Sequence, residues 1–142
     1  AAGRTWLGLR APVVADRGAA MVRLAEDFLS ASALSLDAVA WVSLPDQQAI
    51  RALHSDGDAL LGIAGAVADA AGSHSTLWRA PMAELQPGAL LSVEARGLLP
   101  PSSEGLTRVG PELIVVVDGD AAKDPDAAAC REAAGQLRIA VP

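Results

Sequence analysis

Residues 112–134 read "ELIVVVDGDAAKDPDAAACREAA", and the pairing of this stretch decides the fold. A run of β-prone apolar residues, Leu113 to Val117, stops at the first of several aspartates. Asp124 and Pro125 then form a favourable helix start, because an aspartate caps a first turn and proline suits its first position. The stretch therefore predicts a strand, an acidic turn and a capped helix.

The partner of this strand separates two fold classes. Antiparallel pairing of residues 112–118 with 105–109 predicts an α+β fold, in which two to three helices flank a single five-stranded, mostly antiparallel sheet. Parallel pairing with 137–141 would give an α/β fold with a strand-helix-strand unit at the C-terminus. We expect the first, because short apolar runs separated by prolines follow Gly72 and are typical of antiparallel strands.

Two segments upstream, residues 16–30 and 57–71, predict helices. Both place apolar residues at the spacing of one helix face. These residues are Met21, Leu24, Ala25 and Phe28 in the first segment, and Leu60, Ile63, Ala64, Val67 and Ala71 in the second.

Between the two predicted helices, residues 38–44 and 49–54 read as short strands. The turn-forming pair Pro45-Asp46 separates them, which favours a β-hairpin. Residues 4–9, "RTWLGL", are a further candidate strand that ends at a turn around Pro12.

The resulting order of elements resembles the Roadblock (dynein light-chain type) family of the profilin-like superfold. The segments that carry the resemblance are "DAVAWVSLPDQQAIRALHS", "GDALLGIAGAVADAAG", "LTRVGPELIVVVDGDA" and "DAAACREAAGQL". It implies a single domain over 1–142, with a Roadblock-like core at 16–142 and an N-terminal extension or extra strand at 1–15. Roadblock-like proteins dimerise through their sheets and central helices, and they regulate or scaffold small GTPases.

The leading expectation for function is therefore a non-enzymatic protein-interaction or dimerisation domain, with a second copy, a protein complex or a small GTPase as partner. The interface candidates are Trp78, Arg79, Leu60, Ile63 and Val67. One alternative is a GAF-like sensor with a small-ligand pocket between the sheet and the segment Ser73–Gly88. Another is a segment or subunit of a larger α/β enzyme, such as a molybdopterin oxidoreductase.

Motifs for catalysis are weak, and we predict no catalytic residue, no cofactor and no metal ligand. "IVVVDGD" resembles the start of haloacid dehalogenase-type phosphatases, but too little chain follows Asp120 to supply their other motifs. Cys130 is the only cysteine, and the two histidines, His54 and His74, lack the spacing of a zinc motif. Neither GxxxxGK[ST] nor GxGxxG occurs.

The charge balance bears on partners and location. The chain of 142 residues carries a formal net charge of −6 and has no basic patch, which argues against nucleic acid or an anionic membrane as partner. The most apolar long window, "ALLGIAGAVADAAG", is shorter than the about 20 residues that a membrane span requires. We therefore expect a cytoplasmic protein.

Overall fold

The computed structural model describes residues 5–25, 36–66, 73–117 and 136–140. These residues form eleven strands and two short 3-10 turns, and none of them lies in an α-helix. The strands are β1 (Trp6–Val14), β2 (Gly18–Leu24), β3 (Leu36–Ser43), β4 (Ala49–Asp56), β5 (Ala59–Gly65), β6 (Ser75–Pro81), β7 (Leu90–Ser92), β8 (Glu94–Leu99), β9 (Ser103–Val109), β10 (Glu112–Val117) and β11 (Gln136–Ala140). The 3-10 turns are η1 (Pro45–Gln47) and η2 (Met82–Glu84).

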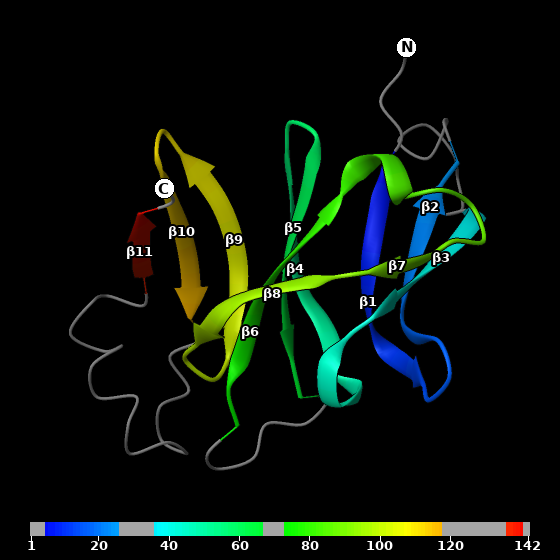
Figure 1. The fold of residues 1–142 in the computed structure, drawn as a ribbon, viewed down its shortest axis with the longest axis horizontal. Helices are drawn as coiled ribbons and strands as arrows, with labels where there is room; N and C mark the ends of the chain where they lie inside the picture. The colour runs from blue at the N-terminus through cyan, green and yellow to red at the C-terminus, as the bar shows by residue number, and fades with distance from the viewer. Residues whose placement is uncertain (1–4, 26–35, 67–72, 118–135, 141–142) are drawn as a thin grey trace.

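The strands form three separate sheets. The N-terminal sheet has the order β1-β2-β3-β7, the central sheet β4-β5-β6-β8, and the C-terminal sheet β11-β10-β9. Neighbouring strands are antiparallel except β3 and β7, which are parallel. The three sheets lie side by side along the long axis of the molecule, with the central sheet in the middle (Figure 1).

The inner strands of the central sheet, β5 and β6, are buried on both faces. One face packs against the N-terminal sheet, in a core that includes Leu60 and Trp78 from the central sheet and Met21 from β2. The other face packs against the C-terminal sheet, where Ile63 meets Val115. Side chains of a strand alternate between the faces of its sheet, so a single strand such as β5 contributes to both cores.

The predicted α+β fold is wrong for the described residues. The segment predicted as a helix at 16–30 contains strand β2, and the one at 57–71 contains strand β5; the remainders of both segments lie outside the described residues. All seven residues of β5 are buried. A strand buried on both faces is a continuous apolar run, so apolar residues fall at helical spacing without a helix being present.

The predicted hairpin is also wrong, although both of its strands exist. β3 belongs to the N-terminal sheet and β4 to the central sheet, so the two do not pair with each other. The chain crosses between the sheets through η1, where Asp46 and Gln47 have positive φ angles of 50° and 53°. The turn predicted at Pro12 lies inside β1, at a register shift between Gly8 and Val13.

The pairing of β10 settles the question raised by residues 112–134. β10 pairs antiparallel with β9, as predicted, and also antiparallel with β11. The α/β alternative, which requires a parallel pair with residues 137–141, is therefore wrong. The helix predicted from Asp124 lies outside the described residues. The order of helices and strands on which the Roadblock resemblance relied is not the order found in the structure.

Candidate functional site

A cavity of about 600 Å³ lies between the central and C-terminal sheets. Its lining comes from β4, β5, β6 and β8 on one side and from β9, β10 and β11 on the other, with Asp58 from the turn that joins β4 and β5. The lining residues are Asp56, Asp58, Ala59, Leu61, Leu77, Arg79, Ala95, Arg96, Arg108, Leu113 and Ile139.

Part of the cavity wall is aliphatic. Leu61 and Leu77 come from neighbouring strands of the central sheet, and Leu113 faces them from the C-terminal sheet, all three in the same hydrophobic core. Leu113 and Ile139 are direct partners across β10 and β11. The sheets meet closely through these side chains but leave a space beside them.

Three arginines and two aspartates also line the cavity. Arg79 Nη2 lies 3.7 Å from Asp58 Oδ1. The Arg79 side chain is 42% exposed and the Asp58 side chain 96% exposed. Arg108 is hydrogen-bonded to the carboxylate of Asp56, and its Nε also donates to the carbonyl of Gly110 at 3.1 Å. Among the described lining residues, positive charges outnumber negative ones by one, three arginines against two aspartates.

The third arginine reaches the cavity through a β-bulge. Leu77 is paired with Gly97, but the next residue of β6, Trp78, is paired with Ala95, so Arg96 is an extra residue in β8. Consecutive side chains of a regular strand point to opposite faces, and a bulge changes their direction. Here both Ala95 and Arg96 line the cavity. Arg96 also donates to Glu94 of its own strand at 2.8 Å.

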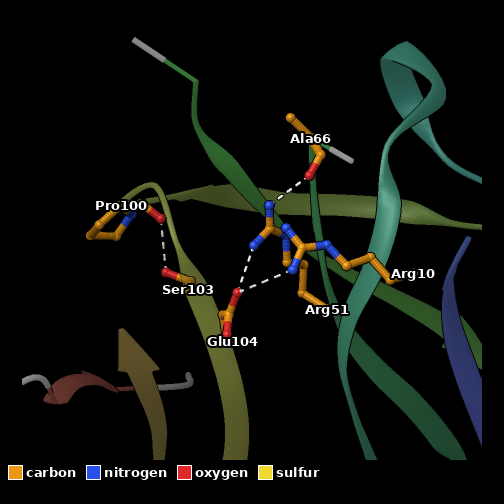
Figure 2. Close-up of polar contacts among 6 residues, drawn as sticks. All are labelled: Arg10, Arg51, Ala66, Pro100, Ser103 and Glu104. Atoms are coloured by element: carbon orange, nitrogen blue, oxygen red, sulfur yellow. Dashed lines mark hydrogen bonds and ion pairs between the residues drawn. The ribbon is translucent and has the colours of Figure 1, made fainter. Parts of the chain in front are cut away.

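A second charged group, away from the cavity lining, joins the same two sheets (Figure 2). Arg51 of β4 donates to Glu104 Oε1 of β9 at 2.7 Å and to the carbonyl of Ala66 at 2.6 Å. Arg10 of β1 approaches the same Oε1 atom at 4.0 Å. The Arg51 side chain is only 2% exposed, so its charge depends on these oxygens for compensation.

β9 itself is fixed at its start next to this group. The hydroxyl of Ser103, which is fully buried, donates to the carbonyl of Pro100 at 2.8 Å (Figure 2). Together with Arg108 and Asp56, the Arg51–Glu104 pair therefore links β4 to β9 at two positions. The two ion pairs hold the C-terminal sheet against the central sheet next to the cavity.

The interface residues proposed from the sequence have different positions. Trp78, Leu60 and Ile63 are buried in the cores on the two faces of the central sheet, so they are not exposed anchors on this chain. Arg79 lies at the cavity. Val67 lies outside the described residues.

The cavity lies partly where the alternative of a small-ligand sensor expected it. Leu77 and Arg79 belong to the segment Ser73–Gly88, but β6 is an inner strand of the central sheet and does not cover a sheet. Arg96 and Arg108 were missed, because the register that brings them to the cavity cannot be read from the residues themselves.

The described ranges also bear on metal binding and on membrane insertion. In these parts of the chain, no three His, Cys, Asp or Glu side chains are close enough to hold a metal ion. The acidic residues from Asp118 to Asp126 and Cys130 lie outside them. None of the segments described is a helix long and apolar enough to cross a membrane.

The chain was compared with models of protein families, with curated proteins and with solved structures, and it matches none of them.

Proposed function

We propose that this protein is a non-enzymatic binding module for a small, partly apolar molecule, which occupies the cavity between the central and C-terminal sheets. The observation that carries the proposal is the lining itself, which combines aliphatic walls with three arginines and two aspartates. Sites for small molecules are typically about 300–1,000 Å³ in volume, with mainly apolar walls and a few polar groups that fix orientation. The volume of about 600 Å³ falls within this range.

The construction of the interface supports a cavity that persists without a ligand. Apart from Asp58 in a short turn, the described wall residues belong to two hydrogen-bonded sheets. The sheets are held together by a hydrophobic core and by the pairs Arg51–Glu104 and Arg108–Asp56. A ligand would then enter a site whose walls are already in place, which lowers the entropic cost of binding.

A neutral fluorescent probe tests this proposal. N-phenyl-1-naphthylamine fluoresces strongly in apolar surroundings, so we expect a saturable increase in fluorescence with the wild-type protein. Ala95→Trp places a large side chain at a cavity position that is exposed, so the substitution disturbs no core and should abolish the signal. Ala11→Trp is the matched control, because Ala11 is exposed on β1 of the N-terminal sheet, and it should leave binding unchanged.

Two outcomes would contradict the proposal. One is a wild-type protein that gives no saturable signal. The other is equal binding by the Ala95→Trp and Ala11→Trp proteins, which would place the probe elsewhere.

The interaction and GTPase-scaffolding role that the Roadblock resemblance implied remains a hypothesis. The central helix that the resemblance implied falls on residues that form β5 in the structure. β5 is buried and lies between two other strands of the central sheet. The binding module is better supported, because a defined group of side chains carries it.

A further inference from the structure

We infer that the ligand of this cavity is an amphipathic anion, whose carboxylate or phosphate head group binds Arg79 and Arg96 while its hydrocarbon part lies against Leu61 and Leu77. The inference rests on the proposed binding function and adds the chemical class of the ligand. Four features of the described residues lead to it.

The first feature is the weak engagement of Arg79. Its ion-pair partner among the described residues, Asp58, has its Oδ1 atom 3.7 Å from Arg79 Nη2 and a side chain that is 96% exposed. An ion pair in such a position contributes little, about 0.2–1 kcal/mol. A ligand anion held against the cavity wall is shielded from water on one side, so it would compete effectively with Asp58 for the guanidinium.

The second feature is the bulge that brings Arg96 to the same side. The direct partner of Arg79 across β6 and β8 is Glu94, and Arg96 follows two residues later. Among the described residues, Arg96 pairs with Glu94, an exposed residue of its own strand. A bulge interrupts the regular ladder of hydrogen bonds. In β8, the bulge lies two residues from the partner of Arg79, and both arginines line the cavity.

The third feature is the contrast with Arg108. This arginine is hydrogen-bonded to Asp56, and the two side chains are less exposed, by 34% and 28%. It also donates to the carbonyl of Gly110. Because Arg108 links β9 to β4, we assign it to holding the sheets together and leave Arg79 and Arg96 as the anion receptor.

The fourth feature is the order of polar and apolar groups on the wall. Leu61 is the direct partner of Arg79 across β5 and β6, and Leu77 precedes Arg79 by two residues, on the same face of β6. Both leucines line the cavity. A molecule whose head group contacts Arg79 would therefore place its carbon chain against the side chains of Leu61 and Leu77. Arginine is well suited to this role because its planar guanidinium can donate two parallel hydrogen bonds to a carboxylate or phosphate.

Displacement of the neutral probe by four compounds with the same alkyl chain tests the inference. The compounds are octanoate, octyl phosphate, octanol and octylamine, each titrated into wild-type protein saturated with N-phenyl-1-naphthylamine at one fixed salt concentration. We expect at least one of the two anions to bind about tenfold more tightly than octanol, the gain typical of a charge-assisted hydrogen bond in place of a neutral one. Octylamine should bind most weakly. The ranking of the two anions would identify the head group.

Substitution of the arginines locates the head group. Arg79→Gln and Arg96→Gln should each weaken binding of the preferred anion about fivefold to tenfold and leave binding of octanol unchanged. Arg138→Gln is the control, because Arg138 is an exposed residue of β11 adjacent to the cavity residue Ile139 and is not itself in the lining. This control should bind the anion as the wild type does.

The outcomes separate this inference from the proposed function. If the probe binds but octanol binds as tightly as both anions, or if none of the four compounds displaces it, the amphipathic-anion inference is wrong and the cavity remains a binding site of another kind. The same holds if Arg138→Gln weakens anion binding as much as the other two substitutions do. If the probe does not bind at all, the proposed function itself fails.

Discussion

The two faces of the central sheet are packed in different ways. Towards the N-terminal sheet, Trp78 is fully buried and its indole lies over Gly62, where an added Cβ would come within 2.1 Å of Trp78 Cζ2. Towards the C-terminal sheet, the core consists of Leu, Ile and Val side chains, with no aromatic residue among those described, and a cavity remains beside it. Here charged pairs between β4 and β9 supplement the apolar contacts.

The difference shows how a chain with few large side chains can form both a filled and an incompletely filled interface. Aromatic residues make up only 3% of the sequence. Trp78 fills the space on one face, whereas aliphatic side chains of smaller volume leave about 600 Å³ on the other. This space is partly open to solvent, and its volume lies in the range of small-molecule sites, which is consistent with the proposed binding function.

The largest effect that we expect comes from removing Trp78 from the core between the central and N-terminal sheets, which we call the filled face. Trp78→Ala should lower the free energy of unfolding by about 3–5 kcal/mol, because it removes a fully buried side chain and leaves a cavity. Urea denaturation followed by circular dichroism measures this loss. Trp41→Ala is the control, since Trp41 is only partly buried on β3, and it should cost much less. Equal losses for the two variants would contradict the account of the filled face.

A double-mutant cycle would sharpen the same point. Gly62→Ala should cost about 1–3 kcal/mol in the wild-type protein, because the new Cβ collides with the Trp78 ring. In the Trp78→Ala background the collision is gone, so the same change should be close to neutral or stabilising. If Gly62→Ala costs the same in both backgrounds, its effect does not come from contact with the indole.

The second prediction compares adjacent residues of β5 that point to the two faces. Leu60 belongs to the filled core and Leu61 lines the cavity, yet both are less than a tenth exposed. Leu60→Ala should cost about 3–4 kcal/mol and Leu61→Ala about 1–2 kcal/mol, because a side chain that already borders a cavity loses fewer contacts when it is shortened. Urea denaturation of both variants measures the difference. If Leu61→Ala is as costly as Leu60→Ala, the space beside Leu61 is not open in solution.

The sequence predicted local strands better than it predicted their partners. The predicted antiparallel pairing of residues 112–118 with 105–109 is found between Glu112–Val117 and Ser103–Val109, and the strands predicted at 38–44 and 49–54 are present as β3 and β4. The hairpin was not found, because Pro45–Gln47 carries the chain from one sheet to the next. A short connection between two strands usually indicates pairing. Asp46 is a residue type that tolerates positive φ, but a Pro-Asp turn does not show whether the chain returns to the same sheet or crosses to another.

The helix predictions failed for a physical reason that applies to β2 and β5. Polar and apolar residues alternate along a strand when one face of its sheet is exposed to water, and this alternation identifies the strand in the sequence. β5 is covered on both faces and has no polar residue. The cavity was even less accessible to prediction. It requires three sheets in a particular order and a bulge at Arg96, both of which are properties of long-range pairing. The one charged residue of β6, Arg79, was a local sign that one face of this strand carries a charge.

The third and smallest effect concerns the ion pairs that hold the cavity side together. Glu104→Gln removes the carboxylate that compensates Arg51, whose side chain is 2% exposed. Breaking a fully buried pair costs about 3–5 kcal/mol, but Glu104 is 40% exposed and water can replace part of the interaction, so we expect about 1–2 kcal/mol. Urea denaturation is again the measurement.

Glu112→Gln is the matched control for this prediction. Glu112 also pairs with an arginine of a neighbouring strand, Arg138, at 3.5 Å, but the arginine is 65% exposed. The loss should stay below about 0.5 kcal/mol, because exposed pairs contribute little. If both substitutions cost the same small amount, then the Arg51–Glu104 pair does not hold the sheets together and the hydrophobic core alone keeps the cavity in place. If Glu104→Gln costs more and also weakens binding of the neutral probe, the pair maintains the spacing of the two sheets, since Glu104 itself is not part of the cavity lining.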